Sequence, residues 1–170
     1  MLKFKFVFIF TLLFSIILTI LGYFTPLELS NDEDIDAQID STFLYLFTNN
    51  LSACVYAVII GSVSLGLYSL FYLFVNFFSI GMILSTLNVK HSIMESLSTF
   101  VIHGVFEIPA MLLSASLGIY IPLKFIQFIR KKRWDKKEML KILWVFSSIL
   151  LLTLIAAFIE AYISPIFIKM

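Results

Sequence analysis

Long apolar runs dominate this chain, and short charged segments separate them. The first run covers residues 4–24 and is broken only by Lys5. Residues 43–87 contain no charged side chain. A helix needs about 20 residues to cross a hydrocarbon core of about 30 Å, so this second run has room for two spans. The glycines and serines of residues 61–66 (GSVSLG) are the natural position for the turn between them.

Two further apolar runs follow, residues 99–123 and residues 142–168, and Pro165 marks an expected helix end in the latter. The pattern therefore predicts a single all-α membrane domain over residues 1–170, a bundle of five spans. An acidic loop at residues 25–42 connects the first span to the second, and a basic loop at residues 124–141 connects the fourth to the fifth. The expected helices cover residues 4–24, 43–60, 67–87, 99–123 and 142–164.

Composition argues against a soluble domain. Hydrophobic residues make up 61% of the chain and charged residues 14%, and the mean hydropathy is +1.02. Soluble domains carry charge on about a quarter of their residues to keep a wetted surface. The single cysteine, Cys54, rules out an intrachain disulfide and is expected to pack as a small hydrophobe.

The basic residues predict the orientation. Lysine and arginine concentrate in short cytoplasmic loops. With a cytoplasmic N-terminus, ten of the twelve basic residues lie inside: Lys3, Lys5, and the eight between Lys124 and Lys141. The loop at residues 25–42, which carries six acids and no base, lies outside. We therefore predict a cytoplasmic N-terminus and an external C-terminus, in a bacterial plasma membrane.

The first span has an alternative interpretation. Two lysines before an apolar stretch also describe a secretory signal peptide. This stretch is long for that purpose, and Gly22-Tyr23-Phe24-Thr25-Pro26 is not an A-x-A-like cleavage site. A retained helix is the prediction. The basic loop is expected to lie against anionic lipid head groups rather than nucleic acid, since no recognition module accompanies it.

Polar residues inside the spans are the candidate functional residues. Ionisable groups at membrane depth cost several kcal/mol and usually face the bundle interior. His103 and Glu107 are four residues apart, so they share one helix face. The predicted topology places them at a depth in the outer leaflet similar to that of Glu160 and the asparagines of the second span, with Asn76 deeper. The predicted polar cluster is Asn49, Asn50, Asn76, His103, Glu107 and Glu160.

Small residues on two spans predict close helix packing. Such residues let membrane helices approach each other. Pro109 cannot donate a backbone hydrogen bond to the carbonyl of Val105, which predicts a kink beside Glu107. The expected packing residues are Ala110, Ser114 and Gly118 on the fourth helix and Ala157 and Ala161 on the fifth.

The run from His103 to Ala110 (HGVFEIPA) resembles the HGxxE-x-P-A signature of the stage II sporulation protein M family. The resemblance spans residues 43–165 and implies a multi-pass bacterial membrane protein that acts with partners at the cell envelope. In spore formers the family is associated with peptidoglycan-remodelling proteins. Short relatives, closer to this chain in length, occur among genes for making and exporting circular bacteriocins. The other matching residues are Phe47-Thr48-Asn49-Asn50, Gly61, Gly66, Asn76, Ala156 to Ala161 and Pro165.

Three functions follow as hypotheses. The first is a non-enzymatic membrane subunit that scaffolds or helps export a partner, with other envelope proteins and the lipid bilayer as its surroundings. The second is a membrane-embedded hydrolase or peptide-processing enzyme that uses His103, Glu107 and Glu160 as acid and base or as metal ligands. The third is a small transporter or immunity protein. The sequence requires no cofactor, and its small-residue faces allow self-association.

Overall fold

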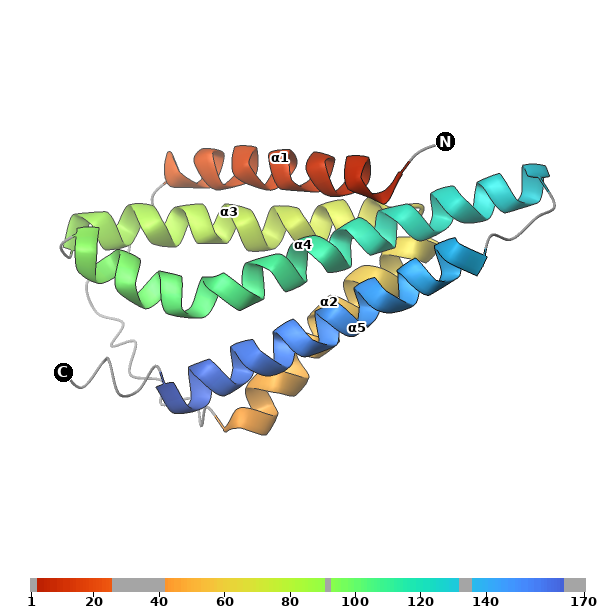
Figure 1. Cartoon of the computed structure of the whole chain (residues 1–170). Coiled ribbons are helices and arrows are strands. Elements are labelled where there is room, and N and C mark those ends of the chain that lie inside the picture. The colour runs from red at the N-terminus through yellow and green to blue at the C-terminus, as the bar shows by residue number, and fades with distance from the viewer. Residues whose placement is uncertain (1–2, 26–41, 91–92, 132–135, 164–170) are drawn as a thin grey trace.

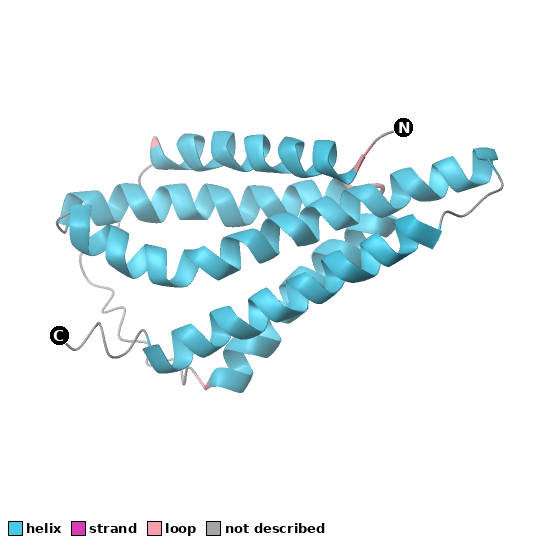
Figure 2. Ribbon diagram, in the orientation of Figure 1, coloured by secondary structure: helices cyan, strands magenta, loops and turns pink. Residues whose placement is uncertain are grey.

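The computed structural model describes residues 3–25, 42–90, 93–131 and 136–163, without the side chains of residues 87–103 and Lys131. All regular structure in these ranges is helical (Figure 2). Each of the five α-helices is long and apolar enough to cross a membrane. The predicted all-α bundle of five spans is thus confirmed, whereas its orientation stays a prediction. The helices are α1 Phe4–Tyr23, α2 Phe43–Val63, α3 Leu67–Lys90, α4 Ile93–Lys131 and α5 Lys136–Phe158, which continues as a π-helical turn, η1 Ile159–Ile163.

Helix α4 lies at the centre of the bundle and contacts each of the other four helices. In its most apolar stretch 56% of the residues are buried, compared with 28% or less in the other spans. Helix α1 packs along α3, and α2 packs against α5 on the opposite side of α4 (Figure 1). Because α4 packs against four neighbours, it needs small side chains at its contacts, and it carries most of the predicted packing residues.

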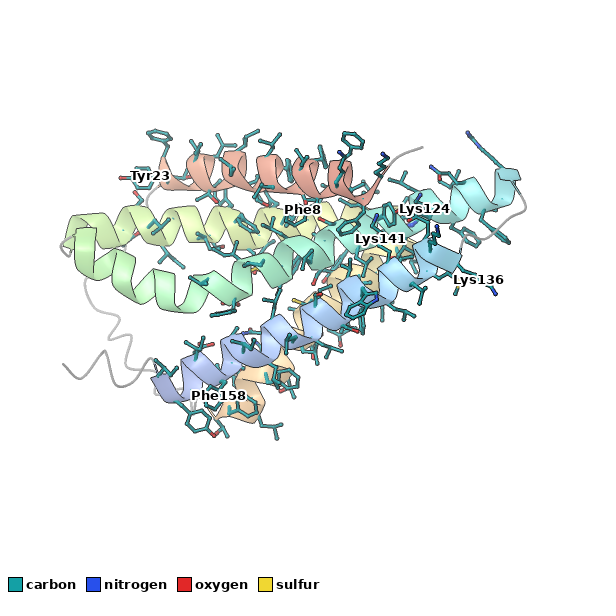
Figure 3. The ribbon with its side chains drawn as sticks, in the orientation of Figure 1. Phe8, Tyr23, Lys124, Lys136, Lys141 and Phe158 are labelled. Carbon is teal, nitrogen blue, oxygen red and sulfur yellow. The ribbon has the colours of Figure 1, made fainter. Side chains whose placement is uncertain are left out.

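Basic side chains gather at one end of the bundle (Figure 3). The start of α1, the turn between α2 and α3, the end of α4 and the start of α5 lie together at one end. Lys124, Lys136 and Lys141 lie there, and we call it the basic end. Tyr23 and Phe158 lie at the other, which we call the distal end. Because basic residues favour the cytoplasmic side, the basic end is the predicted cytoplasmic end.

Helix α4 extends beyond the expected span of residues 99–123 at both ends, and it runs unbroken through Pro109 and Pro122. The eight residues from Lys124 to Lys131, expected in a loop, form its last turns. A basic segment stays helical at a membrane surface because long lysine and arginine side chains carry their charges to water. Figure 1 shows α4 curved in the half that contains Pro109.

Helix α1 has most of its large apolar side chains outside, and small or polar residues make up much of its inner face. Thr11, Ser15 and Gly22 are buried, whereas Phe10 and Ile17 are more than half exposed. In water this distribution would be unfavourable, but in a bilayer the exposed side chains meet lipid and the small face permits close packing. The carbonyl of Phe78 on α3 occupies the space that a Cβ atom at Gly22 would need.

The chain turns between α2 and α3 at residues 64–66, inside the expected segment. Leu65 and Gly66 both have positive φ, at 55° and 96°. Gly66 donates its backbone N–H to the carbonyl of Gly61 at 2.7 Å, which closes α2. Glycine adopts this backbone conformation without steric cost, and it lies against Ile119 of α4.

Candidate functional site: a polar pocket between α3 and α4

A pocket of about 250 Å³ lies between α3 and α4. Its polar lining consists of Asn76 and Ser79 of α3 and Glu107 of α4. The other lining residues are Gly104 and five apolar side chains: Val75, Ile80, Ile83, Ile108 and Met111. A carboxylate and an amide therefore line one cavity within segments long and apolar enough to cross a membrane.

Helical periodicity explains why these residues meet. Asn76, Ile80 and Ile83 follow one another at intervals of four and three, so they share a face of α3 with Ser79. Gly104, Glu107 and Met111 have the corresponding spacing on α4. The two faces run antiparallel, and the small residues Gly104 and Ser79 leave the space that larger side chains would fill.

Hydrogen bonding within α3 orients the Asn76 side chain. Its Nδ2 atom donates to the backbone carbonyl of Tyr72 at 2.8 Å, and the residue is half-buried. With one amide N–H committed to its own helix, the side-chain oxygen is the acceptor that Asn76 can offer to a bound group. Glu107 is also half-buried.

Beside the pocket, toward the basic end, lies a buried polar layer. The Tyr72 hydroxyl and the Cys54 Sγ are 3.7 Å apart, and both residues are buried. Glu107 lies within electrostatic reach of both groups. Ser114 is fully buried and donates to the carbonyl of Ala110 at 2.7 Å. These side chains and the buried Leu73 give the pocket a packed floor.

Further toward the basic end, α2, α3 and α4 cross at very close range. Ser69 of α3 donates to the carbonyl of Ala57 of α2 at 2.9 Å. A Cβ atom at Gly118 would overlap the Ser69 Oγ and that same carbonyl oxygen, and one at Gly61 would overlap the Ser69 Oγ. The predicted packing residue Gly118 thus serves the contact with α2 and α3. Three of the others, Ala110, Ser114 and Ala157, are fully buried, and Ala161 is half-buried.

The structure separates the predicted polar cluster into parts. Asn76 and Glu107 share the pocket, although Asn76 was expected to be only a deeper possible member. Asn49 is exposed and Asn50 half-buried near the start of α2, and Glu160 is half-buried in η1. These last three residues belong to the paired distal parts of α2 and η1, where the rings of Phe43 and Tyr162 stack at 6.3 Å. They do not belong to the described lining of the pocket.

His103 lies on α4 one turn before Glu107, but its side chain is outside the described residues, as is Pro165. Among the described side chains, no three of the types His, Cys, Asp and Glu come together as a metal-ligand set. The predicted ligand set of His103, Glu107 and Glu160 lies partly outside that description and stays a prediction.

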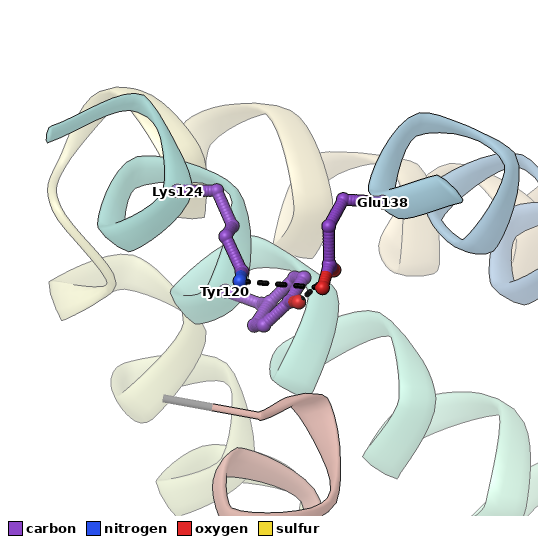
Figure 4. A network of polar contacts seen from close by, with 3 residues as sticks. All are labelled: Tyr120, Lys124 and Glu138. Carbon is purple, nitrogen blue, oxygen red and sulfur yellow. Dashed lines mark hydrogen bonds and ion pairs between the residues drawn. The ribbon is translucent and has the colours of Figure 1, made fainter. Parts of the chain in front are cut away.

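A second polar network, at the basic end, was not predicted from the sequence (Figure 4). The Tyr120 hydroxyl of α4 donates to the Glu138 carboxylate of α5, and the Lys124 Nζ lies 3.4 Å from the other carboxylate oxygen. Lys124 is only 9% exposed, and its ammonium group lies 5.1 Å from the centre of the Tyr120 ring. The rings of Phe4 and Tyr120 make a T-shaped contact with their centres 5.3 Å apart, which joins α1 to the network. From the sequence, Lys124 was expected in a loop. The signal that could have revealed the network is the four-residue spacing of Tyr120 and Lys124, which places both on one helix face.

The fold and the pocket define a class: a multi-pass helical membrane protein with an ionisable side chain in a cavity between two spans. The family model described as Stage II sporulation protein M matches residues 6–165. The chain belongs to the stage II sporulation protein M family, which confirms the resemblance seen in the HGVFEIPA run.

Two relatives come from the archaeon Methanocaldococcus jannaschii. The protein named "Uncharacterized protein MJ0793" is 33% identical over 158 residues, which cover 86% of each chain. The protein named "Uncharacterized protein MJ0706" is 32% identical over 113 residues, which cover 66% of this chain and 49% of the relative. No solved structure matches the chain.

Proposed function

We propose that this protein is a non-enzymatic accessory subunit of a cell-envelope complex, and that it binds a membrane partner at the pocket between α3 and α4. One observation carries the proposal: Glu107 and Asn76 line a cavity between two helices that are long and apolar enough to cross a membrane. On insertion scales a charged side chain in a membrane helix is unfavourable, by up to about 3 kcal/mol at the helix centre. Such a cost is expected where the group has a binding or catalytic role.

The contrast with other polar residues supports a binding role. Thr11 and Ser116 bond to each other at 2.7 Å between α1 and α4, and Ser69 bonds to α2. These contacts are buried and hold helices together. The pocket residues, whatever bonds they make within the bundle, also line a cavity. The family resemblance supplies two settings for such a subunit: circular-bacteriocin maturation or export, and sporulation-type peptidoglycan remodelling.

A membrane-embedded hydrolase is the second candidate, because one specific observation favours it. Glu107 lines a cavity of about 250 Å³, and His103 lies one turn away on the same helix. Pro109 has no N–H for the carbonyl of Val105, which adds a polar backbone group near the pocket. An acid and a base four residues apart could act on a peptide or ester bound there.

Co-purification from the native cell separates the two functions. The tagged protein is isolated with its partners as wild type, as Glu107→Gln and as Asn76→Leu, and its abundance is measured in each case. The proposal expects both variants to be present at normal level but to lose a specific partner. Thr86→Val is the control, because Thr86 is on α3 and bonds to the carbonyl of Met82 within its own helix.

Retention of every partner by a Glu107→Gln protein that has lost its cellular function would favour the hydrolase. Metal content gives a second discriminating result. A stoichiometric metal in the purified protein that is lost on His103→Ala would contradict the non-enzymatic subunit.

A further inference from the structure

We propose that the pocket between α3 and α4 binds the cationic side chain of a lysine or arginine in the membrane-spanning segment of a partner. The inference rests on the proposed function and adds the chemistry of recognition to it. Its evidence is the hydrogen-bonding character of the lining, the size of the cavity and the direction in which the cavity opens.

The polar lining is rich in acceptors. An ionised Glu107 carboxylate only accepts hydrogen bonds, and Asn76 has committed one N–H to the carbonyl of Tyr72. The Ser79 hydroxyl can accept as well. A ligand with several N–H donors and a positive charge complements this set, and charge-assisted hydrogen bonds are the strongest that a protein side chain forms.

The size of the cavity favours an amino-acid side chain. A water molecule takes about 30 Å³ of liquid volume, so a cavity of about 250 Å³ is larger than a bare inorganic ion requires. It is also at or below the lower limit of about 300 Å³ for pockets that hold drug-sized ligands. Ile80, Ile108 and Met111 provide an apolar wall. The methylene stem of lysine or arginine would lie along such a wall, with its charged group at the acceptors.

The described lining leaves the pocket open on the flank of the bundle. Val75 and Ile83 are 45% and 46% exposed, and Ser79 is exposed as well. Toward the basic end the same helices are packed, because Tyr72 and Leu73 are buried. A ligand reaches this cavity from the lipid side, which is where a neighbouring membrane segment lies. The partner therefore brings its cation on a transmembrane helix.

A designed peptide tests this chemistry directly. The purified protein is placed in phosphatidylcholine vesicles with a polyleucine helix that carries one lysine near its middle. The matched control peptide has norleucine in place of the lysine, and association is measured by energy transfer. Because charge-assisted hydrogen bonds exceed neutral ones, the lysine peptide is expected to bind about tenfold or more tightly than the norleucine peptide.

Two protein variants localise the effect. Glu107→Gln is expected to remove most of the lysine preference, whereas Thr86→Val on α3 should preserve it. Equal binding of the two peptides by the wild-type protein would overturn the inference. So would a lysine preference that survives Glu107→Gln.

The experiment is independent of the partner's identity. If native partners depend on Glu107 but the lysine peptide has no advantage, the cationic recognition fails and the proposed function stands. If the lysine preference is present but no native partner depends on Glu107, the site stands and the proposed function fails.

Discussion

At the scale of single residues, the polar side chains of this protein have two different surroundings. Thr11, Ser69 and Ser116 are fully buried and form hydrogen bonds across helix interfaces. They are not among the residues that line the pocket. Asn76 and Glu107 are half-buried beside a cavity. The first group stabilises the bundle, since hydrogen bonds between membrane helices contribute about 0.6–1.7 kcal/mol each. We propose that the second group serves the recognition of a partner.

The bond between Thr11 and Ser116 is expected to couple α1 to α4. A double-mutant cycle with Thr11→Val and Ser116→Ala should give a coupling of about 0.6–1.7 kcal/mol in the free energy of unfolding. The measurement is reversible unfolding in mixed micelles. Additivity of the two single changes would show that the bond at 2.7 Å does not stabilise the bundle.

Glu138 is expected to stabilise the basic end through Tyr120 and Lys124. Glu138→Gln leaves the nearly buried Lys124 ammonium without its anion, which should lower the free energy of unfolding by about 1–3 kcal/mol. Adding Lys124→Met should recover part of the loss, because it removes the unpaired charge. If the double variant is less stable than Glu138→Gln alone, the ion pair is not the source of the effect.

The sequence singled out the polar residues of the spans, but it did not indicate which of their side chains lie together. Asn76 and Glu107 could be singled out because each is costly in an apolar span. Their meeting in one pocket, without Asn49, Asn50 or Glu160 among the described lining residues, depends on the choice of neighbouring helices. The pairing of Tyr120 with Glu138 depends on how far two helices extend beyond the apolar run, and hydropathy does not encode that extension.

At the scale of elements, glycine and serine decide how closely the helices approach. Gly61, Ser69 and Gly118 bring α2, α3 and α4 together near the floor of the pocket, and Gly22 and Gly81 do the same for α1 and α3. The sequence predicted that small residues would pack, because membrane helices associate through such faces. It indicated α4 and α5 as neighbours, which they are, and Gly118 in addition lies against α2 and α3.

Gly118→Ala is expected to disturb this crossing. Its new Cβ atom would overlap the Ala57 carbonyl, which is backbone and cannot move aside as a side chain can. Overpacking of this kind costs about 1–3 kcal/mol in the free energy of unfolding. Ser147→Ala, on the exposed face of α5, is the control and should change stability by less than about 0.5 kcal/mol. Equal stability of Gly118→Ala and wild type would contradict the close approach.

At the scale of the whole molecule, the charge distribution and the arrangement of helices agree. Most of the lysines and arginines lie at one end, although α1 begins at Phe4 and α5 only at Lys136 along the chain (Figure 3). The number of spans followed from apolar length alone. The curvature of α4 and the central position of that helix could not be predicted, because they arise from packing against four neighbours.

Membrane orientation is expected to place the basic end in the cytoplasm. In a Cys54→Ala background, a single cysteine at Thr42, at the start of α2, should react with an impermeant maleimide added to intact cells. A cysteine at Lys136, at the start of α5, should react only after the membrane is opened. The reverse pattern would invert the topology and place the pocket in the other leaflet.

The most direct measurement of the central claim is crosslinking from the pocket in living cells. A photo-reactive residue at Ile83, which lines the pocket and is 46% exposed, should capture a specific membrane partner. The same residue at Phe71, which is 58% exposed on α3 outside the pocket, should not. Glu107→Gln should remove the Ile83 adduct at unchanged protein level. An adduct formed only from Phe71, or one from Ile83 that is indifferent to Glu107, would contradict the assignment of the pocket as the partner site.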